Sequence, residues 1–425
     1  MNNGLCSLSL LVLLIVGTQV AAQETAPLIT KDSESTLIKR KSIVIVRKRS
    51  EKVETKGLKL GNFDFLPAVA LTEYYDDNVF ATDGDEKNDL ITVVTPTFEL
   101  KSDWQQHEFN LDAGVEAVRH VDLAAENTDN AWLNLNGQYD FSKRSHLLAG
   151  VSYMRDHEDR GSADSEAGEN PTEFDDRSVD IGYSGSKGNH FFKFNLNTRR
   201  LDFHDVDSPS RTIDYDDRDR DEDVAGLRYL FRYAPKIAFY FDAVADRRDY
   251  RQTPDNEGND RSSEGSRYAV GIEGVGTNKV GRVFVGRLNR DYQSPDFDKA
   301  EESDFGLQLR WKIYPTTNLL LRSRRSIEET TLDSSPGYLL QNNLLRLSIA
   351  LSKERSLTFD LIAAEADYAA IERQDDYLNY GVAYSQQLLP NLEFGIDAHR
   401  AERDSSTTGE DYRINQVFFR VKAVL

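Results

Sequence analysis

The stretch FGLQLRWKIY, residues 305–314, alternates apolar and polar side chains at every second position. Its apolar positions run from Phe305 to Ile313, and the positions between them carry Arg310 and Lys312. Successive side chains of a β-strand point to opposite faces, so this segment has one apolar face and one wet face. A strand of this kind suits a wall that separates lipid from water.

The same period of two continues along the chain from about residue 63, for example in residues 131–141 and 225–233. Counting such segments predicts about eighteen strands, or 16 or 20 if a hairpin is merged or missed. The expected strands cover residues 64–76, 89–100, 104–120, 128–141, 144–157, 173–185, 189–203, 214–234, 237–251, 264–276, 280–292, 302–314, 317–330, 338–352, 355–369, 374–388, 391–403 and 411–425.

The connectors between these strands alternate in length. Short ones such as Ser142-Lys143 and Pro315-Thr316 take turns with long acidic ones such as 158–172 and 252–263. Outer-membrane barrels have short periplasmic turns and longer outside loops. We therefore predict an all-β fold, an antiparallel transmembrane β-barrel over residues 61–425, with both chain ends in the periplasm.

The first residues predict export. Leu8 to Val16 has the length of a signal-peptide core, and Val20-Ala21-Ala22 offers a small-residue cleavage site, so residues 1–22 are expected to be removed. Cys6, the single cysteine, lies in that segment, so the mature chain holds no disulfide and no thiolate site. After residue 22 no stretch approaches the roughly 20 apolar residues of a membrane helix, which excludes a helical membrane protein.

Residues 23–60 differ from the rest because they are basic. Residues 38–41 and 47–49 carry most of this charge and flank the apolar run Ile43 to Val46. We predict a short periplasmic arm. Either it is a flexible linker with solvated charge, or it contacts acidic lipid or a partner protein through the apolar run as an added strand.

The chain holds 19 Tyr and 21 Phe at a net charge of −20. Near the expected long loops the aromatic residues recur beside Asp. The pairs are Tyr74-Tyr75-Asp76-Asp77, Phe174-Asp175-Asp176, Tyr215-Asp216-Asp217, Asp249-Tyr250, Asp291-Tyr292, Asp376-Tyr377 and Asp411-Tyr412. Amphipathic rings favour the headgroup level, so these pairs are interpreted as an outer aromatic girdle.

The last strand carries apolar residues on one parity from Val417 to Leu425. It resembles the assembly signal of bacterial outer-membrane proteins, except that Leu425 stands where an aromatic residue is usual. The resemblance implies recognition of this strand by the barrel assembly machinery.

From residue 62 to the end, the chain resembles the putative β-barrel porin type 2 family. The motifs that carry the resemblance are Phe65-Leu66-Pro67, Tyr75 to Phe80, Asp89-Leu90-Ile91, Thr95-Pro96 and Trp104. They are structural motifs, and none is a catalytic signature. The family implies an outer-membrane barrel associated with exopolysaccharide production, in which polysaccharide passes or is anchored.

The wet faces carry many cations, and these are the candidate pore-lining residues: Arg228, Arg232, Arg310, Lys312, Arg322, Arg324, Arg346 and Arg420. Acids such as Asp112, Glu116, Asp242 and Asp360 are expected on the same inner surface. Either these charges compensate one another and keep the barrel rigid, or the cations form a basic wall that favours an anionic solute.

We find no pattern of a catalytic, metal or cofactor site. The seven histidines are scattered without a metal-binding spacing, and no phosphate loop is present. His399, expected near the outer end of its strand, is the one candidate for a barrel hydrolase. The acidic runs 214–223 and 296–304 are interpreted as solvated loops, with Ca²⁺ binding or bridging to lipopolysaccharide phosphates as the alternative.

The leading interpretation is a non-enzymatic pore of the outer membrane that assists export of an exopolysaccharide, with an anionic polymer as one option. A general diffusion porin is the first alternative, with residues 155–176 as its expected inward loop, and a lipid or glycan hydrolase is the second. The expected partners are outer-membrane lipid and lipopolysaccharide, polysaccharide and periplasmic export proteins, with no nucleic acid and no cofactor.

Overall fold

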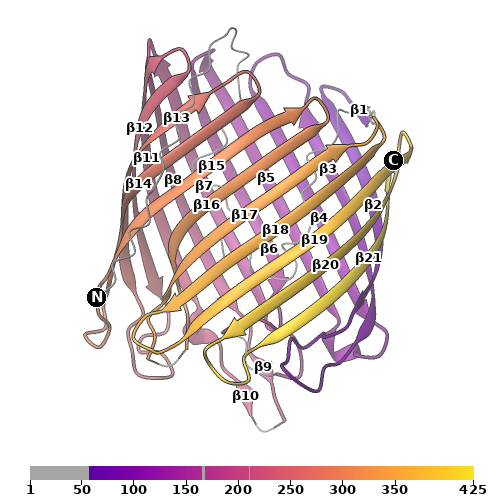
Figure 1. The fold of residues 1–425 in the computed structure, drawn as a ribbon, viewed down its shortest axis with the longest axis vertical. Helices are drawn as coiled ribbons and strands as arrows, with labels where there is room; N and C mark the ends of the chain where they lie inside the picture. Colours follow the sequence, from indigo (N-terminus) through magenta and orange to yellow (C-terminus); the bar gives the residue numbers. More distant parts are fainter. Residues whose placement is uncertain (1–56, 165–167, 210, 333) are drawn as a thin grey trace, which may run out of the picture.

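The protein is a closed β-barrel. The computed structural model describes residues 57–164, 168–209, 211–332 and 334–425, so the predicted signal peptide and most of the predicted arm lie outside the described residues. Eighteen long strands pair antiparallel with their neighbours in sequence, and β21 pairs with β2, which closes the ring (Figure 1). The predicted fold class and strand number are therefore confirmed.

The bounds of the wall strands agree with the expected ones to within a few residues, with one exception described below. The wall strands are β2 (Phe63–Asp76), β3 (Asp89–Ser102), β4 (Glu108–His120), β5 (Thr128–Ser142), β6 (Ser145–His157), β7 (Glu173–Lys187), β8 (His190–Phe203), β11 (Arg220–Ala234), β12 (Ile237–Tyr250), β13 (Ser263–Val275), β14 (Lys279–Tyr292), β15 (Ala300–Tyr314), β16 (Thr317–Glu328), β17 (Tyr338–Ala350), β18 (Arg355–Tyr368), β19 (Gln374–Leu389), β20 (Leu392–Ser405) and β21 (Tyr412–Val424). A short strand β1 (Leu58–Leu60) folds back on β2.

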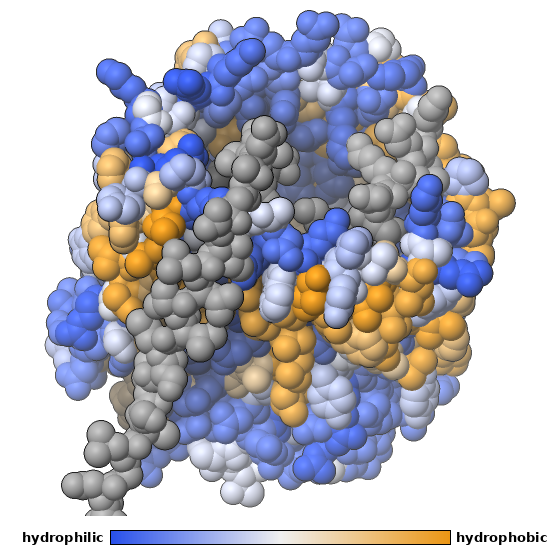
Figure 2. Space-filling model, turned by 45° about the horizontal axis from the view of Figure 1, so that its top comes forward, coloured by the Kyte–Doolittle hydropathy of each residue, from blue (hydrophilic) through white to orange (hydrophobic). Residues whose placement is uncertain are grey.

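Alternation along each strand puts apolar side chains on the outside. On β13, Val270 is 56% exposed while its neighbour Ala269, on the inner face, is 2% exposed. Figure 2 shows the result as a band of hydrophobic residues on the outer wall, with hydrophilic residues above and below it. In a water-soluble protein most large apolar side chains lie in the interior, whereas here they lie on the outer surface, as expected for a wall that faces lipid.

The connectors divide the molecule into two ends. The short turns, such as residues 143–144 and 315–316, share one end with β1 and the carboxyl terminus, at the top of Figure 1. The long connectors gather at the opposite end, where β9 (Val206–Asp207) and β10 (Thr212–Ile213) form a small hairpin. We call these the short-turn end and the long-loop end.

One predicted strand begins too early. Residues 214–219 were expected to be the start of the strand that ends at residue 234, but they form a turn with the 3₁₀ helix η3 (Asp216–Arg218). The amide of Asp216 donates to the Asp214 carboxylate at 2.9 Å, and such side-chain bonds compete with a strand ladder. Among the described residues no helix is long and apolar enough to cross a membrane.

The predicted outer aromatic girdle is wrong for most of its members. Phe174, Tyr215, Tyr250, Tyr377 and Tyr412 are all less than 8% exposed and pack beneath the long loops. The strand residues among them lie on the inner parity, so their rings face the interior. Tyr75, which has the outer parity on β2, is 45% exposed.

Four inward rings lie directly opposite a glycine of the next strand. The pairs are Trp132 with Gly114, Tyr240 with Gly271, Phe284 with Gly306 and His399 with Gly381. A Cβ built on any of these glycines would stand less than 3.0 Å from the facing ring. Each glycine thus lets a ring lie flat against the wall instead of projecting across the interior.

Candidate functional site: the barrel lumen

Two large cavities in the barrel interior are lined by residues that the structure describes. The larger, about 2210 Å³, runs from the middle of the barrel to the short-turn end, where Arg144, Lys236, Lys279 and Lys353 line it. Figure 2 looks obliquely onto this end and shows hydrophilic residues around its rim. The smaller cavity, about 1130 Å³, lies toward the long loops and is lined there by Tyr250, Tyr377 and Tyr412.

The two cavities meet at a set of residues that lines both, which we call the junction. It consists of Glu116, Trp132, His157, Glu158, Asp159, Arg228, Arg282, Gln308 and Arg310. These residues come from the walls and from the start of connector 158–172. A solute that travels between the two cavities has to pass them.

All eight predicted pore-lining residues face the interior. Arg228, Arg232, Arg310, Lys312, Arg346 and Arg420 line the larger cavity, and Arg322 and Arg324 line the smaller one. Arg310 and Arg346 stand at the same level on either side of Leu320, and Arg322 is two residues further along β16. Whether the eight residues line a conducting pore stays a prediction.

The charge balance of the lumen differs from place to place. Arg346 forms a two-point ion pair with Asp360, at 2.6 and 3.2 Å, and Arg228 pairs in the same way with Asp242. In contrast, no ion pair of the described residues involves Arg310 or Lys312, which are both exposed to the larger cavity. Some cations of the lumen are therefore compensated locally, whereas Arg310 and Lys312 have no ion-pair partner among the described residues. Whether such cations favour an anionic solute stays a prediction.

Acids occupy the wall across from these cations. Asp112 and Glu116 lie on β4. Arg310 lies on β15, which is nine strands away from β4 in the ring of 18 wall strands, so the two strands face each other across the lumen. Asp112 accepts hydrogen bonds from Trp132 Nε1 at 2.8 Å and from Asn134 at 3.4 Å, and Glu116 accepts one from Asn130 at 3.0 Å. The junction is therefore acidic on one side and basic on the other, which sets up an electric field across the lumen.

The described residues of connector 158–172, which are 158–164 and 168–172, fold toward the barrel interior. Its first residues line the lumen, and Glu169 returns to β9 through a backbone hydrogen bond to Asp207. Its partners belong to connectors all round the ring. They include Glu126 after β4, Arg218 before β11, Thr330 after β16 and Arg403 at the end of β20. Residues 155–176 were predicted as the inward loop, and the structure places part of this segment in the lumen.

Two buried ion pairs hold the first residues of connector 158–172 in place. Arg218 holds Glu158 by two hydrogen bonds of 2.8 and 2.5 Å, and Arg160 holds Glu126 by two of 2.9 and 2.6 Å. None of the four side chains is more than 9% exposed. Asp164 adds hydrogen bonds from Thr330 Oγ1 at 2.5 Å and from the Thr331 amide at 3.0 Å. Breaking such a buried pair by removing one partner is strongly unfavourable, so the connector is held firmly.

His399 faces the lumen from the middle of β20, not from its outer end as expected. It is 7% exposed, lies against Phe418, and its Nδ1 has no hydrogen-bond partner. No serine of the described residues donates a hydrogen bond to it. In the described part of the chain, His399 is therefore not paired with a serine nucleophile.

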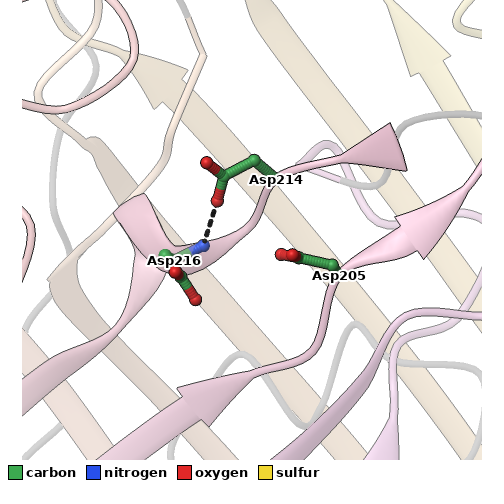
Figure 3. A group of neighbouring side chains, drawn as sticks. All are labelled: Asp205, Asp214 and Asp216. Carbon is green, nitrogen blue, oxygen red and sulfur yellow. Dashed lines mark hydrogen bonds between the residues drawn. The ribbon is translucent and has the colours of Figure 1, made fainter. Parts of the chain in front are cut away.

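One acidic group at the long-loop end has the spacing of metal ligands. Carboxylate atoms of Asp205, Asp214 and Asp216 all lie within 4.8 Å of one another (Figure 3). Partial desolvation by nearby loop atoms and the neighbouring carboxylates of Asp205 and Asp214 raise the pKa of Asp216. All three side chains are exposed, and Asp205 and Asp214 accept hydrogen bonds from the amides of Tyr215 and Asp216, at 3.0 and 2.9 Å. These bonds form a turn, and calcium binding by this run stays a prediction.

Several lumen residues were not picked out from the sequence. Arg282 shares the inner parity of β14 but sits among glycine and valine, so no run of charge marks it. Trp132 falls on a polar parity, which was the available signal that its ring faces the lumen. The Arg218–Glu158 and Arg160–Glu126 pairs join residues 60 and 34 positions apart. No local pattern predicts such pairs.

Comparison with known proteins gives one family match. The model of a family described as putative beta-barrel porin 2 matches residues 51–424. Among solved structures, Pseudomonas aeruginosa OccK3 (OpdO) matches with a TM-score of 0.47 at 12% identity, covering 85% of this chain and 96% of that one. Acinetobacter baumannii OccAB4 matches with a TM-score of 0.45 at 10% identity, covering 85% and 98%. No curated protein matches the chain.

Proposed function

The chain belongs to the putative beta-barrel porin 2 family, and on that premise we propose that it is a non-enzymatic pore of the Gram-negative outer membrane that assists export of an exopolysaccharide. The apolar band of the outer wall supports membrane insertion, because a closed barrel leaves no unpaired backbone groups in lipid. By analogy with bacterial barrels, the short-turn end and both termini face the periplasm. The long loops then face outward.

The observation that carries the proposal is the lumen itself. A cavity of about 2210 Å³ opens toward the short turns and continues past the junction into a second cavity. Barrels of 16 to 18 strands are wide enough for an aqueous channel. The larger cavity is large enough for several sugar units, and its polar wall offers hydrogen-bond partners for hydroxyl groups. Free cations such as Arg310 and Lys312 favour an acidic polymer.

The proposal is tested by planar-bilayer recording on the purified protein, with the wild type compared with a variant in which connector residues 159–171 are replaced by a short glycine-serine link. We expect small or rare conductance in the wild type and a larger conductance in the variant. If both proteins are silent, the lumen is no pore and the proposal fails.

A second candidate, a general diffusion porin, is favoured by one observation, the inward connector. Such porins narrow the lumen with one loop, and residues 158–164 of connector 158–172 line the lumen here. Liposome swelling with sugars of graded size separates the two functions. Rapid entry of mono- and disaccharides with a sharp size limit indicates a porin, whereas a conduit for a polymer admits long linear glycans and shows no sharp limit.

Export predicts a partner on the periplasmic side and a polymer inside the lumen. Lipid, lipopolysaccharide and the assembly machinery are the other proposed contacts, the last through β21. Co-purification of the protein with a periplasmic export lipoprotein from the native cell, lost when the short turns are altered, would support the exporter over the porin.

A further inference from the structure

We infer that the junction is a binding subsite for an acidic oligosaccharide that reaches across the lumen, with one sugar ring on Trp132 and the carboxylate of another unit toward Arg282 and Arg310. This inference rests on the proposed function and specifies the substrate class of the same lumen. Three features carry it: a free aromatic face, a set of hydroxyl partners beside that face, and cations without acidic partners across the lumen.

The aromatic face belongs to Trp132. Its indole lies against the backbone of β4 because Gly114, directly opposite, has no side chain. One face of the ring is therefore turned to the lumen. Two other rings held by glycines are covered by cations, since Arg228 stacks on Tyr240 at 4.7 Å and Arg267 on Phe284 at 4.9 Å. No cation of the described residues covers Trp132, so its face is open to a ligand.

The ring is fixed in orientation and surrounded by hydrogen-bonding groups. Trp132 Nε1 donates to Asp112 at 2.8 Å, which stops the indole from turning. Beside it, Asn130 donates to Glu116 at 3.0 Å and lies 2.9 Å from His157 Nδ1. Carboxylates and amides bind sugar hydroxyls well, because together they both accept and donate. A pyranose ring stacked on Trp132 would have its hydroxyl groups at this rim.

The cations across the lumen are available to an anion. Arg282 donates to the neutral side chain of Gln308, and no ion pair of the described residues involves Arg282 or Arg310. Both arginines line the junction together with Trp132. A guanidinium matches the planar geometry of a carboxylate. A neutral oligosaccharide would use only the Trp132 side, whereas an oligomer of uronates that reaches across the lumen would use both sides.

Equilibrium binding in detergent tests the subsite without any need for conductance. The variant Trp104→Phe/Trp311→Phe leaves Trp132 as the only one of the three tryptophans. We expect trigalacturonate to change its fluorescence saturably, and maltotriose to bind about tenfold or more weakly. Calorimetric titration of the wild type with the same two sugars gives the affinities without any substitution.

Two variants locate the site. Trp132→Ala should weaken binding of both sugars by about fivefold or more, because stacking serves both. Arg282→Gln/Arg310→Gln should weaken only trigalacturonate. The matched control Arg144→Gln/Lys353→Gln removes the same charge at the short-turn end and should retain the preference. No saturable binding at millimolar sugar, or equal effects of the two double variants, overturns the subsite.

The binding experiment and the bilayer experiment can fail independently of each other. Binding at Trp132 in a protein that never conducts would leave the subsite in place and remove the pore. Conductance without binding would leave the pore and remove the subsite.

Discussion

Glu158 and Arg218, 60 positions apart, form a two-point ion pair whose bonds measure 2.8 and 2.5 Å and whose side chains are almost fully buried. Glu158 begins the inward connector, and Arg218 belongs to η3 at the long-loop end. The pair therefore links the inward connector to another outer loop. In a closed barrel, whose wall is rigid, a contact between two loops is the natural place for a change between closed and open states.

The first prediction concerns this pair. Glu158→Gln removes the carboxylate that pairs with the buried Arg218, and breaking such a pair costs about 3–5 kcal/mol when nothing relaxes. The connector should release this cost by leaving the lumen, so we expect more frequent or larger openings in planar bilayers. Glu257→Gln, at an exposed position of another long loop, is the matched control. Identical recordings for both variants would show that the connector does not close the pore.

The second prediction concerns Gly114. Gly114→Ala places a methyl group against the Trp132 ring, and overpacking of this kind costs about 1–3 kcal/mol. Urea unfolding in lipid vesicles should show this loss. Gly84→Ala, where nothing lies near the added methyl group, should show none.

A second substitution checks the cause of that loss. If the ring is responsible, Gly114→Ala combined with Trp132→Leu should be less destabilised than the sum of the two single variants. Additive losses would mean that the strand backbone, and not the ring, requires the glycine.

The third prediction concerns ion selectivity. Arg310 and Lys312 stand in the larger cavity without ion pairs, so Arg310→Gln/Lys312→Gln should shift the reversal potential in a salt gradient toward cations. Arg346→Gln/Asp360→Asn removes a neutral pair and should leave the potential unchanged. Cation preference in the wild type would show that the acidic wall, not these two residues, sets the selectivity.

The fourth prediction concerns pH. Burial raises the pKa of Asp219, just before β11, to about 6, well above the unfolded value of about 3.9. The folded loop therefore holds a proton that the unfolded chain has lost between about pH 4 and 6, so its stability falls as pH rises through this range. Amides of residues 204–219 should be better protected from hydrogen exchange at pH 5 than at pH 7.5, after correction for intrinsic rates.

Asp219→Asn should remove this dependence, because the amide stays neutral while its oxygen can still accept from the amide of Phe203, a bond of 2.6 Å in the wild type. Asp298→Asn, at an exposed position of another loop, should keep it. A loop with equal protection at both pH values would mean that Asp219 is solvated.

The wall of the barrel was predictable because each strand repeats one rule. The alternation at Phe305 to Ile313 reports a lipid face and a wet face without any knowledge of neighbours, and it places Arg310 correctly in the interior. The same rule, applied to Tyr250 and Tyr377, would have placed both rings inward. Their proximity to Asp suggested an interface instead, and that inference failed because parity determines direction whereas composition does not.

From the sequence, residues 155–176 could be named as a candidate inward loop, but the contacts that hold this loop could not be predicted. The partners of connector 158–172, such as Glu126 and Arg403, are brought near it by the ring and not by the sequence. The junction was missed for the same reason, because Trp132 and Arg310 belong to strands on opposite sides. Local patterns report the direction in which a side chain points, but not the side chain that it meets.

The pairing of β2 with β21 bears on how the molecule is made. Ala68 is the partner of Val424, so the ring cannot close before nearly the whole chain is available. Until then two strand edges carry unpaired backbone groups, which lipid does not tolerate. Insertion into the membrane and the pairing of β2 with β21 must therefore occur together. This step should be slow, because it joins residues that are far apart in the sequence, and it should be all-or-none. A chain truncated before β21 should be degraded rather than inserted as a smaller pore.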